Sequence, residues 1–110
     1  MEIIIKTKGL EMNPELETFI NKQISSLKKF LAINAKGLIE VEVGIVTKHH
    51  QKGNIYSAEI LIECPRGKVL RAYSEKQNTQ IALTDAKKEI EAQLTKFKEK
   101  LLTERKQIEE

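Results

Sequence analysis

Two segments in the middle of the chain alternate apolar and charged residues, and this alternation limits the folds open to it. Segments 39–47 and 55–64 both carry aliphatic residues on one side and mostly glutamates on the other. Successive side chains of a strand point to opposite faces, so a period of two predicts strands with one covered face and one wet face. The predicted inward residues are Val41, Val43, Ile45, Ala58, Ile60 and Ile62, and the predicted outward residues are Glu40, Glu42, Gly44, Glu59, Leu61 and Glu63.

The remaining segments supply two more strands and two helices. Residues 2–8 alternate in the same way, and residues 68–73 follow the turn Pro65-Arg66-Gly67, which predicts a hairpin with segment 55–64. Asn13 and Pro14 mark the start of a first helix as N-cap and first helical residue. A second helix is predicted to begin between Ser74 and Thr79 and to run to about Leu102. Apolar residues recur at steps of three and four in both helices, at Leu16, Ile20, Ile24, Leu27 and Leu31, and at Leu83, Ala86, Ile90, Leu94, Phe97 and Leu101.

The order of these elements predicts the fold class. Strand, helix, three strands and helix (β-α-β-β-β-α) give an α/β two-layer sandwich with a four-stranded sheet and two helices on one face. A length of 110 residues corresponds to one domain, predicted over residues 1–102, with residues 103–110 forming a charged C-terminal tail that we expect to be flexible. The chain contains one cysteine and no apolar run long enough to cross a membrane, so we expect a cytoplasmic location.

Residues typical of catalysis or metal binding are few. The common phosphate-loop, dinucleotide and nucleophile motifs are absent, so no enzymatic activity and no cofactor are expected. His49 and His50 are adjacent and point to different sides, so a solvated loop is favoured over a metal site. A phosphate contact by this lysine-rich loop and a small metal-dependent enzyme that uses the two histidines are the less favoured alternatives. Cys64 is expected to be structural, and Tyr56 and Tyr73 are expected to pack in the core or on the sheet.

The lysines point more clearly to a partner. Residues 86–106 contain seven basic and four acidic side chains, whereas the outward sheet face gathers Glu40, Glu42, Glu59 and Glu63, so the predicted helices are basic and the predicted sheet face is acidic. The net charge is only +3, and mixed lysine and glutamate on a helix is equally typical of a solvated surface. Clustered cations suit a polyanion such as RNA. The stripe of residues 86–97 also fits a protein-interaction adaptor that pairs through its C-terminal amphipathic helix as a coiled coil.

Three segments resemble one known family in their order and spacing. They are TKGLEMNPELETFINKQISSLKKF near the start, AEILIECPRGKVLRA in the hairpin and IALTDAKKEIEAQLTKFKEK in the last helix. Together they resemble the ribosome-associated inhibitor and hibernation-promoting proteins of the short type, also called sigma modulation or ribosomal subunit interface proteins. One departure is Gln77-Asn78-Thr79-Gln80, where the family usually opens the last helix with an acidic-Asp-Met-Tyr segment. Asn78 can still cap that helix.

The resemblance implies a ribosome hibernation factor that acts in stress and stationary phase. Such a protein binds the small ribosomal subunit at the decoding and tRNA channel and inhibits translation by blocking the mRNA and tRNA sites, without a reaction. It implies no small-molecule substrate and no membrane, a monomer off the ribosome, and a fold similar in outline to a double-stranded RNA-binding domain. Carried over by position, the implied rRNA-binding residues are Lys22, Lys28, Lys29, Arg66, Lys76, Lys87, Lys88, Lys96, Lys98 and Lys100.

Overall fold

The computed structural model describes residues 2–31, 38–46, 53–64 and 67–109. The elements follow the order β1 (Glu2–Lys8), α1 (Pro14–Leu31), β2 (Leu38–Val46), β3 (Ile55–Glu63), β4 (Val69–Lys76) and α2 (Thr79–Glu109). The four strands form one sheet in the order β1-β2-β3-β4. β1 pairs with β2 in parallel, and β2–β3 and β3–β4 are antiparallel. The predicted order of elements and the predicted hairpin are therefore confirmed.

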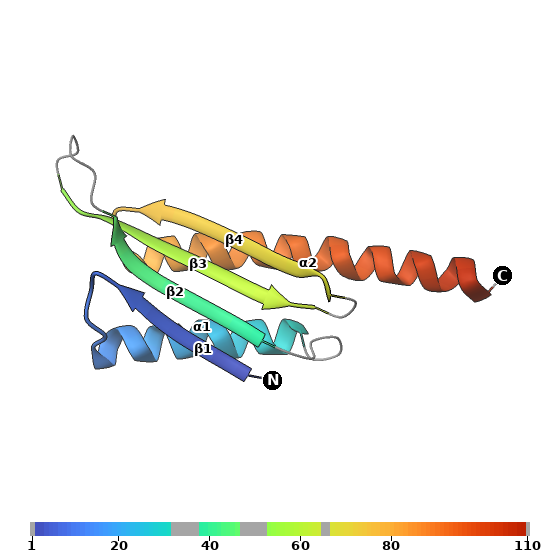
Figure 1. Ribbon diagram of the computed structural model, residues 1–110, viewed down its shortest axis with the longest axis horizontal. Coiled ribbons are helices and arrows are strands. Elements are labelled where there is room, and N and C mark those ends of the chain that lie inside the picture. Colours follow the sequence, from blue (N-terminus) through green and yellow to red (C-terminus); the bar gives the residue numbers. More distant parts are fainter. Residues whose placement is uncertain (1, 32–37, 47–52, 65–66, 110) are drawn as a thin grey trace.

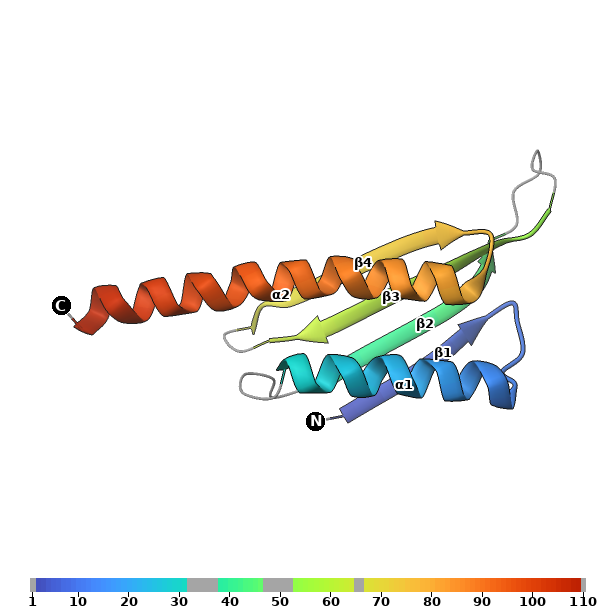
Figure 2. The same cartoon turned by 180° about the vertical axis from the view of Figure 1, so that it is seen from behind.

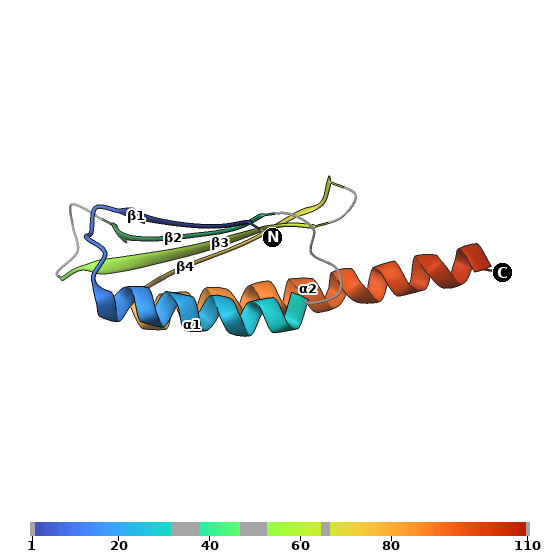
Figure 3. The same ribbon diagram turned by 90° about the horizontal axis from the view of Figure 1, so that it is seen from below.

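The molecule has two layers, as Figure 1 and the view from behind in Figure 2 show. Seen from below, both helices lie on the same side of the sheet, and the other sheet face is uncovered (Figure 3). This confirms the predicted two-layer sandwich. The longest dimension of the molecule is 58 Å, because the last turns of α2 project beyond the sheet (Figure 1).

Both helices begin at an asparagine cap. The backbone N–H of Leu16 donates to Oδ1 of Asn13 at 2.8 Å, and the N–H of Gln80 donates to Oδ1 of Asn78 at 2.7 Å. Each bond satisfies a donor that the first helical turn would otherwise leave without a partner. The two predicted caps are confirmed, and the second shows that α2 begins normally despite its unusual opening segment.

The core lies between the sheet and the helices and follows the two predicted periodicities. Rows of side chains cross the sheet from strand to strand, such as Ile39–Ile62–Leu70 and Val41–Ile60–Ala72. All of these residues are buried, as are the helix stripes that cover them, which consist of Ile20, Ile24 and Leu27 on α1 and Leu83, Ala86, Ile90 and Leu94 on α2. Leu16 and Phe97 pack at the margins of this core. The side chains of Leu31 and Leu101 lie outside the described residues.

Two element ends differ from the prediction. β4 continues to Lys76 rather than ending at Tyr73, because its backbone stays paired with β3 as far as Tyr56, opposite Lys76. Ser74 is buried under α2, and its hydroxyl donates to Asp85 Oδ2 at 2.8 Å. α2 continues to Glu109 rather than ending near Leu102. The last segment contains no glycine or proline to stop the helix, and its Glu, Arg, Lys and Gln residues favour helix. The flexibility of residues 103–110 stays a prediction.

Two isoleucines of α2 provide a matched test of this core. Ile90 is fully buried, whereas the side chain of Ile81 is 55% exposed. We expect Ile90→Ala to lower the free energy of unfolding by about 2–5 kcal/mol, since it leaves a cavity, and Ile81→Ala to lower it by less than about 1 kcal/mol. Denaturant unfolding measures both values. Equal losses would contradict the assignment of the buried face of α2.

Candidate nucleic-acid interface

The cations of α1 lie on its solvent side. At about 100° per residue, Lys22 and Lys29 lie close to 180° from the buried stripe, and Lys28 lies about 80° to one side of it. All three side chains are exposed. Phe19, which faces α2, lies on the opposite flank of α1, so Lys28 points away from α2. The three predicted lysines of α1 therefore remain available to a partner.

Three cations of α2 are similarly placed. Lys88 lies about 160° from Ile90, on the back of the helix, and Lys96 and Lys100 lie on the flank that faces away from α1. All three are exposed. We call the six exposed side chains the helix-layer cations: Lys22, Lys28, Lys29, Lys88, Lys96 and Lys100. They occupy the outer surface and outer flanks of the helix layer.

Lys87 is a weaker candidate than its neighbour. Its side chain is only 18% exposed, and its Nζ lies 3.4 Å from Glu91 Oε1 on the next turn. It borders a small hollow between the helices, together with Ile24 and Leu27 of α1. Lys98, on the same flank of α2, is half-buried. Both lysines are thus less exposed than the helix-layer cations, and Lys87 lies beside α1.

The remaining predicted positions lie at the ends of strands. Lys76, the last residue of β4, is about half exposed, and its Nζ lies 4.0 Å from Asp85 Oδ2. Arg66, His49 and His50 lie outside the described residues. Their predicted contacts with RNA therefore stay predictions.

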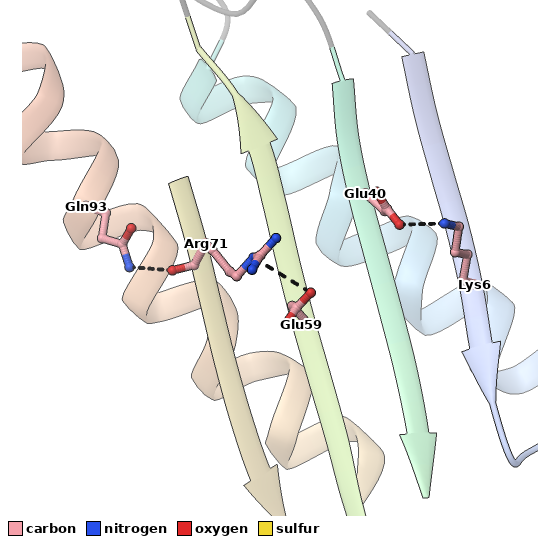
Figure 4. Close-up of polar contacts among 5 residues, drawn as sticks. All are labelled: Lys6, Glu40, Glu59, Arg71 and Gln93. Carbon is pink, nitrogen blue, oxygen red and sulfur yellow. Dashed lines mark hydrogen bonds and ion pairs between the residues drawn. The ribbon is translucent and has the colours of Figure 1, made fainter. Parts of the chain in front are cut away.

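The uncovered face of the sheet, which we call the open face, is less purely acidic than predicted. Its two edge strands contribute cations, and two of these form ion pairs (Figure 4). Lys6 Nζ lies 2.8 Å from Glu40 Oε1, and Arg71 Nε lies 3.9 Å from Glu59 Oε1. The hydrogen bond to Glu40 raises the pKa of Lys6. The prediction considered the two central strands and missed the charges that β1 and β4 add.

Within residues 2–31, 38–46, 53–64 and 67–109, no three His, Cys, Asp or Glu side chains gather in a way that could hold a metal ion. No helix in this part of the chain is long and apolar enough to span a membrane.

Tyr73 is exposed on the open face, where its hydroxyl donates to Glu75 Oε1 at 2.6 Å, a bond that raises the pKa of Tyr73.

Comparison with known proteins decides the family. The sequence model of the family described as Sigma 54 modulation protein / S30EA ribosomal protein matches residues 3–102. The chain belongs to this family. It is therefore a ribosome-associated modulation protein, and the family is not known for enzymatic activity. No curated protein matches the sequence significantly.

Two solved structures have the same fold as this family member. The N-terminal domain of Protein Y from Thermus thermophilus aligns with a TM-score of 0.64 and 20% identity, covering 88% of this chain and 99% of that one. A ribosomal subunit interface protein from Coxiella burnetii aligns with a TM-score of 0.63 and 16% identity, covering 89% of this chain and 98% of that one. At this identity, the likeness shows the fold alone.

The structure also bears on the coiled-coil adaptor. Its proposed seam requires a free apolar stripe on α2, but Ala86, Ile90 and Leu94 are buried against the sheet. Over this part of α2, the stripe is the inner face of the protein's own core. The stripe therefore gives no support to pairing through α2.

Cys64 follows β3 and is 7% exposed, which agrees with a structural role. Desolvation raises the pKa of its thiol, and nearby Lys68 opposes this shift. Because the thiolate is the reactive form, we expect iodoacetamide to modify native Cys64 at pH 8 much more slowly than the unfolded chain. Mass spectrometry with and without denaturant measures both rates. Equal rates would show that the thiol is accessible and ionised in the folded protein.

Proposed function

We propose that this protein binds the small ribosomal subunit at its interface side, over the decoding and tRNA channel. There it inhibits translation by occupying the sites of mRNA and tRNA. Its partner is the rRNA of the decoding region, and its location is the cytoplasm. Membership in a ribosome-associated family supports the ribosome as partner. The site and the mode of inhibition are the part that we propose.

The observation that carries this proposal is the distribution of charge between the layers. The helix-layer cations are exposed on the outer side of the helices. On the open face, glutamates lie on the central strands, and the cations Lys6 and Arg71 lie on the edge strands, where they form ion pairs with Glu40 and Glu59. Phosphate groups would therefore be attracted to the helix layer and repelled by the glutamates of β2 and β3. This predicts that the helix layer faces RNA and that the open face points away from it.

The chemistry of the helix layer suits contact with the RNA backbone. Lysine ammonium groups neutralise phosphates without reading sequence. Reading unstacked bases usually requires exposed aromatic side chains, yet Tyr73 lies on the open face and Tyr56 is half-buried beside the start of α2. Recognition would therefore depend on the shape of folded RNA and on its phosphates. Inhibition then needs only that a rigid protein occupies the channel.

Neutralising one lysine on each layer tests this orientation. We expect Lys88→Gln to weaken co-sedimentation with small subunits and to reduce the slope of log affinity against log salt concentration by about 0.7–0.9, since one phosphate contact is lost. Lys8→Gln is the matched control, because Lys8 is an exposed lysine in register with Gly44 on the open face. Equal losses in the two variants would refute the proposed orientation.

A translation assay extends the same test to function. Reversing four helix-layer cations, with Lys22, Lys29, Lys88 and Lys96 each replaced by Glu, should abolish inhibition of translation by purified ribosomes. Circular dichroism confirms that the variant is folded. Undiminished inhibition by the folded variant would exclude the helix layer as the ribosome-binding surface.

A further inference from the structure

The register of the sheet places two glutamates directly opposite each other on the open face. Glu42 of β2 pairs with Glu59 of β3, and these two strands are the central strands of the sheet. Side chains at directly opposed positions on one face lie about 5 Å apart at their Cβ atoms, and like charges there are destabilising. The sheet therefore contains a repulsive pair on a surface that no helix covers.

The cations of the open face offset this repulsion only in part. Lys6 stands opposite Glu42 in the register, but its ammonium group bonds Glu40 at 2.8 Å. Arg71 reaches Glu59 only at 3.9 Å and comes from the neighbouring row of the sheet. Within the part of the chain that the structure describes, Glu42 forms no hydrogen bond or ion pair, although the charge of Lys6 attracts it from a longer range. A cation supplied from outside would satisfy both carboxylates.

An aromatic ring extends the row on the other side. Tyr73 of β4 stands opposite Glu59, and its side chain is 49% exposed. Its hydroxyl donates to Glu75 Oε1 at 2.6 Å, which fixes the tip of the ring at the sheet surface. Glu42, Glu59 and Tyr73 thus form a line of two carboxylates and one aromatic ring across three adjacent strands.

We propose that this line is a recognition site for an arginine side chain carried by a partner protein. A planar guanidinium group can donate to both carboxylates with its fork of N–H groups and stack on the tyrosine ring, which an ammonium group cannot do equally well. The glutamates exclude RNA as the occupant, because phosphates would be repelled. The site therefore fits a protein segment.

Leu61, next to this line on the open face, predicts a second side chain in the partner segment. Leu61 lies two residues beyond Glu59 on the same face and is half-buried. Residues two apart in an extended chain are separated by about 7 Å, the same spacing as these two positions on β3. An extended segment with arginine and, two residues along, an aliphatic side chain would fill both positions.

This site lies on the layer opposite the helix-layer cations, so it goes beyond the proposed function and does not depend on it. If the helix layer contacts RNA, the open face stays accessible to a protein segment. If the helix layer does not contact RNA, the arginine site is unaffected. The two proposals can therefore fail separately.

The test is an NMR titration of the full chain with a short, flexible Ser/Gly peptide that contains arginine and a leucine two residues away. We expect resonance shifts confined to β2, β3 and β4. Glu42→Gln combined with Glu59→Gln should weaken binding at least about tenfold, and Tyr73→Leu about threefold, whereas Tyr73→Phe retains the ring and most of the affinity. The matched control, Glu89→Gln with Glu99→Gln on α2, removes the same charge from the helix layer and should bind normally.

Replacing the arginine of the peptide by citrulline, which is neutral and of similar shape, should abolish binding. Equal binding of the citrulline peptide, an equal loss in the α2 control, or no binding at all would overturn the proposal. Resonance shifts of open-face residues on addition of RNA would show that this face binds RNA. The same shifts on raising the protein concentration alone would show that it binds a second copy of the protein. Either result would overturn the proposal.

A second measurement tests the repulsion itself. Glu42→Gln should raise the midpoint of thermal unfolding, since it removes a like-charge contact without changing the shape of the side chain. A lower midpoint would show that the two carboxylates do not conflict, and the argument for an external cation would then fail.

Discussion

The burial of one sheet face by two helices is the constraint on which the other features of this protein depend. Val41 and Ile60 are buried because α1 and α2 cover them with side chains such as Ile20 and Leu83. A chain of 110 residues has enough apolar side chains for one such layer of core, and its strands place glutamates where a second layer of helices would pack. The opposite sheet face is consequently open to solvent and to partners.

This asymmetry separates the charges of the protein into two surfaces. Exposed lysines gather on the outer side of the helices, and the glutamates of β2 and β3 gather on the open face. Each surface then suits a different partner: the first a phosphate backbone and the second a cationic side chain. In the function that we propose, a rigid protein with these two surfaces acts by occupying a channel, which requires no catalytic residues.

Sequence patterns predicted the order of elements, the cap at Asn13 and the buried stripe of α2, because local periodicity and capping chemistry determine them. They could not predict properties that depend on how the elements pair. The pairing of Glu42 with Glu59 follows from the strand register, and the covering of Lys87 follows from the packing of α1 on α2. A helical projection places Lys87 on a flank and Lys88 on the back of α2, but it does not show that α1 packs beside the flank of Lys87.

Directed cleavage of ribosomal RNA tests most directly whether the helix layer faces the decoding channel. Cys64→Ala removes the native thiol, and a single cysteine then carries an iron chelate that generates hydroxyl radicals, either at Lys88→Cys on the helix layer or at Lys8→Cys on the open face. We predict strong cleavage of the decoding-region RNA of the small subunit from position 88 and weak cleavage from position 8. Stronger cleavage from position 8, or cleavage only at sites remote from the channel, would contradict the account.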